Sequence, residues 1–226
     1  MKKTEQKQSR GRLEVVCGSM FSGKTEELMR RLRRAEYAKQ RVLTIKYHID
    51  QRYNRAPTCI VSHAGRERFA FVVTDDGDSM NKILELAQAE IDTIGLDEVH
   101  FFSPLIVDII LQLVNAGKRV IIAGLELDFR GEPFAHVAKL LALADDVTKL
   151  KAICVQCGAE GHFTQRIVNG APASYDDPVI VVGAAELYEA RCRNCFAIDK
   201  GPFGTDQTSS YTAAATPKEK PSQGSV

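Results

Sequence analysis

No stretch of this sequence approaches the ~18 consecutive apolar residues that a membrane-spanning helix needs. Its first ten residues are largely charged or polar and lack the apolar core of a signal peptide. No internal repeat is visible along the 226 residues. These absences argue against a membrane-embedded or secreted protein. The sequence therefore predicts a cytoplasmic protein without a membrane partner.

Net charge is nearly absent as well. The 30 Lys and Arg residues are offset by 29 Asp and Glu residues, which gives a formal charge of +1. A broad nucleic-acid surface needs concentrated basic charge, so no nucleic-acid partner is predicted. A local basic run between Arg30 and Arg41 is the exception. On a helix these positions spread around the circumference, which favours a solvated helix face.

What the sequence does contain is a phosphate-binding pattern, G-x-x-x-x-G-K-[ST], matched at every fixed position by Gly18-Ser19-Met20-Phe21-Ser22-Gly23-Lys24-Thr25. A β-prone stretch, Leu13–Cys17, precedes the pattern, and apolar residues at helical spacing follow it. In this context the loop N–H groups surround a polyphosphate and the helix N-terminus faces it. Lys24 is expected to reach the β- and γ-phosphates, and the Thr25 hydroxyl to bind Mg²⁺. The flanks disfavour a chance Gly/Ser turn and predict ATP or GTP binding.

Four of the six cysteines form two C-x₂-C pairs, the spacing of a closed structural zinc site: Cys154, Cys157, Cys192 and Cys195. The gap between the pairs exceeds the ~15–20 residues of a compact ribbon, so a substantial loop must leave and return. Two disulfides and a redox C-x-x-C are the alternatives; the first is disfavoured in the cytosol and the second needs only one pair. Cys17 is isolated and is expected to pack as a small hydrophobe.

The rest of the chain alternates between strand and helix patterns, which predicts a mostly parallel sheet with helices on both faces. Predicted strands are Leu13–Cys17, Val42–His48, Thr93–Asp97, Arg119–Gly124 and Thr148–Ile153, with shorter ones at Cys59–Val61 and Phe69–Val73. Predicted helices are Thr25–Lys39, Ser79–Ile91, Pro104–Ala116, which stops at Asn115-Ala116-Gly117, and Phe134–Leu143.

Motif positions and composition together predict four regions along the chain. They are a disordered N-terminus (1–10), a P-loop α/β nucleotide-binding domain (11–150), a zinc- and nucleoside-binding domain (151–200), and a disordered tail (201–226). The tail has too few apolar residues to offset the entropy lost on ordering. The fold class is therefore an α/β, P-loop NTPase-like sheet flanked by helices, with a small zinc-ribbon-like domain carrying a long substrate-covering loop.

Two carboxylates follow the predicted strand Thr93–Asp97. Asp97 is expected beside the phosphate loop, where it could organise Mg²⁺ and its waters, because carboxyl ends of parallel strands share one sheet edge. Glu98 could accept a proton from the attacking group, water in an ATPase or a hydroxyl in a kinase. Gly95 interrupts the apolar run before Asp97, so an exposed Asp-Glu pair in a loop is the alternative reading.

Taken in order, the motifs resemble the type II (cellular-type) thymidine kinase family from about Leu13 to Asp199. The residues that carry the resemblance are the phosphate loop, Asp97-Glu98-Val99-His100-Phe101-Phe102, Gly124-Leu125-Glu126-Leu127-Asp128-Phe129, both cysteine pairs and Val182-Gly183-Ala184-Ala185-Glu186-Leu187-Tyr188. Two departures are His100, where the family usually has Gln, and Glu126, where it usually has Asp.

The resemblance implies a Mg²⁺-dependent thymidine kinase that transfers the γ-phosphoryl of ATP to the 5′-hydroxyl of thymidine or deoxyuridine. The product would be dTMP, a DNA precursor made by salvage. Glu98 is implied as the general base, with ATP and Mg²⁺ held by Gly18, Ser19, Met20, Phe21, Ser22, Gly23, Lys24, Thr25 and Asp97. The implied nucleoside contacts are Met20, Phe101, Leu125, Phe129, Thr164 and Tyr188, with main-chain contacts from Val179, Ile180, Val181, Val182 and Gly183. The implied metal is a structural Zn²⁺, and the implied assembly is a homotetramer inhibited by dTTP.

Two other readings stay open. A zinc-ribbon P-loop ATPase that remodels nucleic acid would use the basic run as its tracking surface and predicts polynucleotide-stimulated hydrolysis. A non-catalytic nucleotide-sensing switch would have no need of Glu98. A cation near the transferred group could come from Arg52, Arg55 or Arg130, and the sequence does not choose among them.

Overall fold

The computed structural model describes residues 11–48, 58–61, 65–74, 77–88, 90–179 and 188–199. Its main element is a six-stranded sheet in the order β5-β2-β6-β7-β1-β8, with every pair parallel. The strands are β1 (Arg12–Cys17), β2 (Val42–Tyr47), β5 (Phe71–Val73), β6 (Thr93–Asp97), β7 (Arg119–Gly124) and β8 (Asp146–Lys149). The predicted parallel α/β sheet is confirmed.

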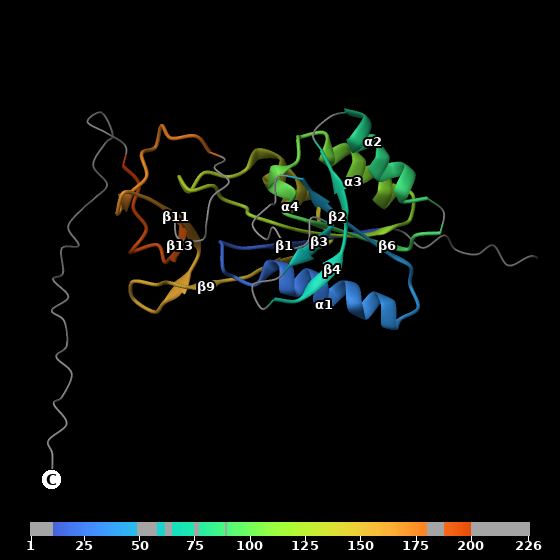
Figure 1. Cartoon of the computed structure of the whole chain (residues 1–226), viewed down its shortest axis with the longest axis horizontal. Helices are drawn as coiled ribbons and strands as arrows, with labels where there is room; N and C mark the ends of the chain where they lie inside the picture. The colour runs from blue at the N-terminus through green and yellow to red at the C-terminus, as the bar shows by residue number, and fades with distance from the viewer. Residues whose placement is uncertain are drawn as a thin grey trace, which may run out of the picture.

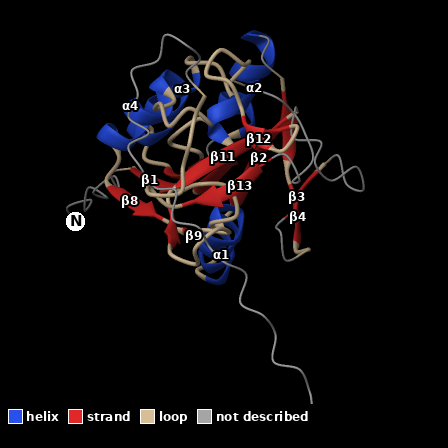
Figure 2. Ribbon diagram, turned by 90° about the vertical axis from the view of Figure 1, so that its left-hand side faces the viewer, coloured by secondary structure: helices blue, strands red, loops and turns tan. Residues whose placement is uncertain are grey.

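Helices cover both faces of this sheet. The helix α1 (Lys24–Tyr37) lies on one face, and α2 (Gly77–Leu86), α3 (Ile106–Asn115) and α4 (Ala135–Leu143) lie on the other, as Figures 1 and 2 show. The predicted helix stop is confirmed, because α3 ends at Asn115 and Gly117 follows with φ 85°. The helix α2 ends at Leu86, earlier than the predicted Ile91.

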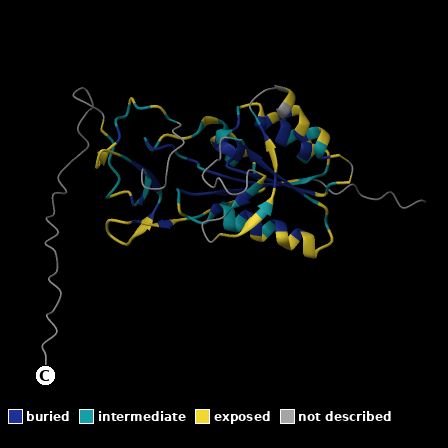
Figure 3. Ribbon diagram, viewed as in Figure 1, coloured by how far each residue is buried: buried dark blue, intermediate teal, exposed yellow. Residues whose placement is uncertain are grey.

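Alternating side chains of the central strands enter two separate cores. Val15 and Ile122 pack on the side of α3 and α4, whereas Val16 and Ile121 pack against α1. The strands are buried on both faces, as Figure 3 shows, which is why they read as continuous apolar runs. Gly95 of β6 makes room for α1, since a Cβ there would lie 2.6 Å from Leu32 Cδ1. This explains the glycine that interrupts the apolar run.

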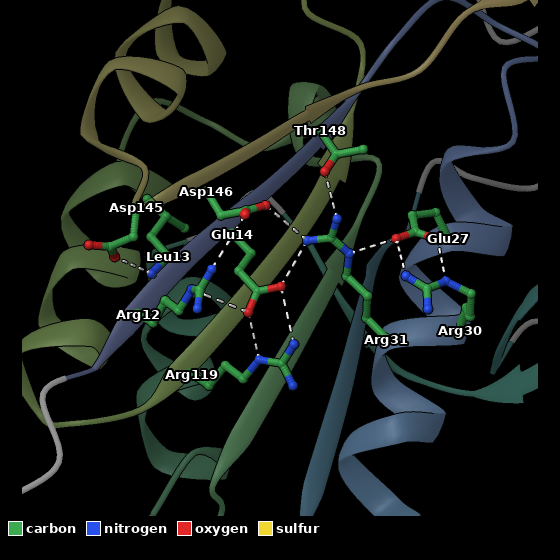
Figure 4. Close-up of polar contacts among 10 residues, drawn as sticks. All are labelled: Arg12, Leu13, Glu14, Glu27, Arg30, Arg31, Arg119, Asp145, Asp146 and Thr148. Carbon is green, nitrogen blue, oxygen red and sulfur yellow. Dashed lines mark hydrogen bonds and ion pairs between the residues drawn. The ribbon is translucent and has the colours of Figure 1, made fainter.

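A buried ion cluster fixes α1 on the sheet (Figure 4). Glu14 of β1 is 5% exposed and accepts hydrogen bonds from Arg31 Nη1 at 2.8 Å and Arg119 Nε at 2.7 Å. Arg31 also donates to Glu27 of its own helix and to Thr148 Oγ1 of β8. Burial raises the pKa of Glu14, but the hydrogen bonds and charges of Arg119 and Arg31 outweigh it and leave that pKa below its ordinary value. Arg31 is thus the exception in a basic run that is otherwise exposed.

Smaller antiparallel units complete the fold. A hairpin of β3 (Cys59–Val61) and β4 (Glu67–Phe69) lies beside α1. Beyond one end of the parallel sheet in Figure 1, β9 (Ala152–Ile153) pairs with β10 (Glu160–Gly161), and β11 (Phe163–Val168) pairs with β12 (Ala171–Pro172) and β13 (Tyr188–Arg191).

Two predicted strands are corrected by this topology. Thr148–Ile153 is not one strand, because its first part belongs to β8 in the parallel sheet and its last part is β9 in the small one. Between them Leu150 N–H donates to Cys17 O, so contact with β1 extends one residue beyond Lys149. Phe69–Val73 is likewise divided, with the buried Ala70 between β4 and β5. The predicted disordered ends, 1–10 and 201–226, lie outside the described residues, and the domain boundaries stay predictions.

Candidate functional site

The phosphate loop connects the carboxyl end of β1 to the first turn of α1. Gly18 needs to be glycine because a Cβ there would lie 2.5 Å from Leu150 O and 2.6 Å from Ser22 Oγ. Gly23 precedes the helix with φ 85°, a left-handed conformation that favours glycine. The loop therefore ends at a helix N-terminus, where the first backbone N–H groups point toward the loop and suit an anion.

Three side chains of the predicted nucleotide site meet at this helix start. Lys24 is 8% exposed, and its Nζ donates to Ser19 O within the loop at 2.8 Å. The Thr25 hydroxyl donates to Asp97 Oδ2 at 3.1 Å. Asp97 Oδ1 also accepts the Glu98 N–H at 3.0 Å, so the carboxylate is fixed from two sides. A hydroxyl and a carboxylate side by side are the hard oxygen donors that Mg²⁺ prefers.

Glu98 follows Asp97 in a left-handed conformation, φ 52° and ψ 45°, and is 7% exposed. Its Oε2 lies 3.5 Å from His100 Nδ1. That nitrogen also accepts the Leu125 N–H at 3.2 Å. The His100 ring contacts those of Phe101 and Phe134, at 4.2 and 5.2 Å between centroids. His100 thus connects the acid-bearing loop to the end of β7.

Glu126 stands where the family that the sequence resembles usually has Asp. It is 5% exposed and its Oε1 is 3.2 Å from Lys149 Nζ, a cation that the sequence analysis did not identify.

Burial, with a smaller effect of Glu126, raises the pKa of the Cys17 thiol to about 11. Cys17 therefore stays protonated and packs as the small hydrophobe that was predicted.

The predicted nucleoside residues are seen in three separate sets of contacts. In the first, Met20 N–H donates to Thr164 Oγ1 at 3.0 Å, and in the second, Leu125 and Phe101 both contact His100. In the third, Phe129 is buried below the Arg166 guanidinium, and Tyr188 pairs with Arg166 across β13 and β11. Val179 is described, whereas Ile180, Val181, Val182 and Gly183 lie outside the described residues.

Two arginines near Phe129 were missed as a pair by the sequence reasoning. The guanidinium carbons of Arg166 and Arg130 lie 5.0 and 5.4 Å from the centre of the Phe129 ring. Arg166 Nη1 donates to Pro178 O at 2.7 Å, and Arg130 Nη2 donates to Asp177 O at 2.8 Å. They hold the two carbonyls that precede Val179. No local signal in the sequence reveals such main-chain partners. Of the three candidate cations, Arg130 is engaged in this way, and Arg52 and Arg55 lie outside the described residues.

The two cysteine pairs come together as predicted. The Sγ atoms of Cys154, Cys157, Cys192 and Cys195 all lie within 4.8 Å of one another, and no disulfide joins any of the six cysteines. Backbone hydrogen bonds form a tight turn at each pair, from Gly158 N–H to Cys154 O and from Cys195 N–H to Cys192 O. Four thiolates with no other donor suit a closed, tetrahedral zinc site.

A parallel sheet with a phosphate loop between its first strand and first helix defines a P-loop nucleotide-binding protein. Residues 11–196 match the family model described as thymidine kinase. That match covers most of the chain, and the chain belongs to the thymidine kinase family.

Among the described residues, no helix is long and apolar enough to cross a membrane.

Two solved structures show partial similarity. One, titled crystal structure of DNA replication initiation factor, is 16% identical with a TM-score of 0.39. The other, titled replication initiator DnaA bound to AMPPCP and single-stranded DNA, is 17% identical with a TM-score of 0.40. Each alignment covers 62% of this chain and 40% of the other. These low scores carry no functional conclusion.

Proposed function

We propose that this chain is an ATP:thymidine 5′-phosphotransferase that acts on thymidine and deoxyuridine. The observation that carries the proposal is that the buried Glu98 directly follows Asp97, the carboxylate that accepts the Thr25 hydroxyl of the phosphate loop. A nucleotide sensor has no need of a second buried carboxylate at this place. Membership of the thymidine kinase family supports the nucleoside as the acceptor.

In the proposed reaction the 5′-oxygen of the nucleoside forms a bond to the γ-phosphorus, and the bond from that phosphorus to the β–γ bridging oxygen breaks. ADP leaves, and the hydroxyl proton passes to the Glu98 carboxylate. Lys24 exchanges Ser19 O for the phosphate oxygens. Mg²⁺, held through Thr25 and Asp97, would supply neutralising charge, which is what a loose phosphoryl-transfer transition state needs.

The thymine would be enclosed by Met20, Phe101, Leu125, Phe129, Thr164 and Tyr188, with main-chain contacts from Val179 to Gly183. Arg130 and Arg166 support this proposal because they hold the carbonyls immediately before Val179. A structural Zn²⁺ on the four cysteines, a domain boundary near residue 150, a homotetramer, dTTP inhibition and a cytoplasmic location complete the proposal.

The test is incubation with Mg²⁺, γ-labelled ATP and a panel of thymidine, deoxyuridine and deoxycytidine, with monophosphates as the readout. Main-chain reading of the base mismatches at least two buried contacts with cytosine. Each mismatch costs ~1–3 kcal/mol, so kcat/KM for deoxycytidine should be lower by ~10²–10⁴. The 5-methyl group is worth only about 1 kcal/mol, so deoxyuridine should remain a substrate. Label released as phosphate only on addition of polynucleotide, with no monophosphate formed, would favour the remodelling ATPase instead.

A further inference from the structure

The first half of the phosphate loop is hydrogen-bonded to the small strands that flank the cysteine cluster. The Ser19 hydroxyl donates to Gly161 O of β10 at 3.3 Å, and the Met20 N–H donates to Thr164 Oγ1 of β11 at 3.0 Å. Ser19 and Thr164 are each 3% exposed, so water does not compete freely for these bonds. The loop is therefore attached to these strands by two contacts, a buried one to Gly161 and a partly buried one to Thr164.

Both of these strands are also tied to the cysteines. β10 pairs with β9, and the turn between them contains Cys154 and Cys157. β11 pairs with β13, where Phe163 lies opposite Arg191, the residue before Cys192. β13 begins at Tyr188, so β11 is fixed to the strand that follows the proposed base-reading segment. The loop that would hold ATP is thus joined to the strand that would hold the nucleoside.

We propose that Thr164 is a positioning residue whose hydroxyl couples ATP binding at the phosphate loop to nucleoside binding at β11; this inference rests on the proposed function. A ligand at either site favours the arrangement in which Met20 N–H and Thr164 Oγ1 are bonded. Binding of the first ligand already orders part of the phosphate loop and β11, so the second ligand loses less conformational entropy when it binds. Each ligand therefore binds more tightly in the presence of the other. By linkage the effect is the same in both directions.

The chemistry of the contact gives a sharp pair of variants. Thr164→Val keeps the shape of the side chain but leaves the Met20 N–H without its acceptor. Thr164→Ser restores the acceptor. Thr44→Val is the matched control, since Thr44 is 4% exposed on a strand of the same protein and its Oγ1 accepts a hydrogen bond from Arg68 Nε at 2.7 Å. This substitution also removes a buried hydroxyl acceptor, and Thr44 lies in β2, outside both proposed binding sites.

The quantity to measure is a ratio, the Kd of a non-hydrolysable Mg·ATP analogue without thymidine divided by its Kd with saturating thymidine, by calorimetry. In the wild type this ratio should be about 5 or more. In Thr164→Val it should fall toward one, by about 3-fold or more. Thr164→Ser should recover it, and Thr44→Val should keep it at the wild-type value. A ratio of one in the wild type, or the same ratio in Thr164→Val as in the wild type, would overturn the proposal.

A second measurement needs only the wild-type protein and stands if Thr164→Val does not fold. Thymidine alone should slow hydrogen exchange at the Met20 amide several-fold, because it stabilises the bonded arrangement. Unchanged exchange at that amide with thymidine bound would refute the coupling while leaving the proposed kinase intact. If the analogue binds and thymidine does not, the proposed function fails, and the coupling fails with it.

Discussion

Glu98 has a backbone conformation that non-glycine residues seldom adopt, and holding it costs about 1–3 kcal/mol. Two backbone contacts maintain it: the Glu98 N–H donates to Asp97 Oδ1, and the Phe101 N–H donates to Glu98 O at 3.0 Å. The consequence at the residue scale is that two successive carboxylates serve different partners. Asp97 faces Thr25, whereas Glu98 faces the ring of His100.

Glu98→Gln tests the role of the second carboxylate. Loss of a positioned proton acceptor should lower kcat by ~10²–10⁴. The affinity for the ATP analogue should change little, because Lys24 and the loop amides are untouched, whereas the comparison variant Lys24→Ala should weaken both binding and turnover. Steady-state kinetics and calorimetry measure the two effects. A Glu98→Gln enzyme with more than about a tenth of wild-type kcat would show that another group takes the proton.

At the scale of elements, charged side chains hold α1, the helix that follows the phosphate loop, against the sheet. The partly buried Glu27 of this helix accepts hydrogen bonds from Arg30 Nε at 2.6 Å and from Arg31 Nε at 2.8 Å. These contacts lower the pKa of Glu27 to about 2, with the Arg30 hydrogen bond as the largest cause. The buried side of the same helix is held by Glu14 through Arg31, so one arginine joins the surface pair to the interior.

This arrangement predicts a pH-dependent contribution of Glu27 to stability. Its folded-state pKa is depressed, so the stabilisation is full above the ordinary value of 4.5 and is lost as pH falls toward about 2. Glu27→Gln should therefore lower the free energy of unfolding at pH 7, by about 0.5–1 kcal/mol or more, because Glu27 is partly buried between an exposed and a shielded arginine. The gap to the wild type should close between pH ~5 and ~2. Urea unfolding at a series of pH values measures it.

Asp108→Asn is the control for that series. Asp108 is exposed in the first turn of α3, and within the described part of the chain no ion pair is seen for it. Like Glu27, Asp108 is an acidic residue near a helix N-terminus, where negative charge is stabilising, but it has no arginine partner among the described residues. A stability gap for Glu27→Gln that is the same at pH 7 and pH 3 would mean that the arginine pair contributes nothing.

At the scale of the whole molecule, the parallel sheet and the small antiparallel strands form one connected body around the loop. Leu150 N–H donates to Cys17 O where the chain leaves β8, and Ser19 and Met20 contact β10 and β11. The four cysteines lie in the turn between β9 and β10 and just after the end of β13. A metal there would act on the site only through the strands, since all four of its positions are filled by thiolates.

The corresponding prediction is one Zn²⁺ per chain, measured by elemental analysis of the purified protein. Removing it with a chelator should raise the KM for thymidine before the parallel sheet unfolds, because the turns at both cysteine pairs loosen first. Cys192→Ser should lose the metal. Cys59→Ser should keep it, because Cys59 lies in β3, outside the cluster. Metal-free protein with all four thiols intact would contradict the prediction.

Local patterns explain what could be predicted from the sequence. The phosphate loop and the cysteine pairs are read from spacings of a few residues, and β1 and β7 are mostly apolar segments of six residues. Distant partners explain the rest. The split of Thr148–Ile153 depends on which sheet each half joins, and the bond from Leu125 to His100 spans 25 positions along the chain. No window of sequence contains both ends of such contacts.

The strand order has a consequence for how the reacting groups are spaced. β7 lies between β1, which ends at the loop, and β6, which ends at Asp97. Neighbouring strands lie about 4.8 Å apart, so the two ends are separated by about 10 Å, a span that can hold a phosphate chain and a metal ion. The main-chain hydrogen bonds between these strands fix their spacing. The main-chain pairing of β6, β7 and β1 therefore sets the distance between Asp97 and the phosphate loop.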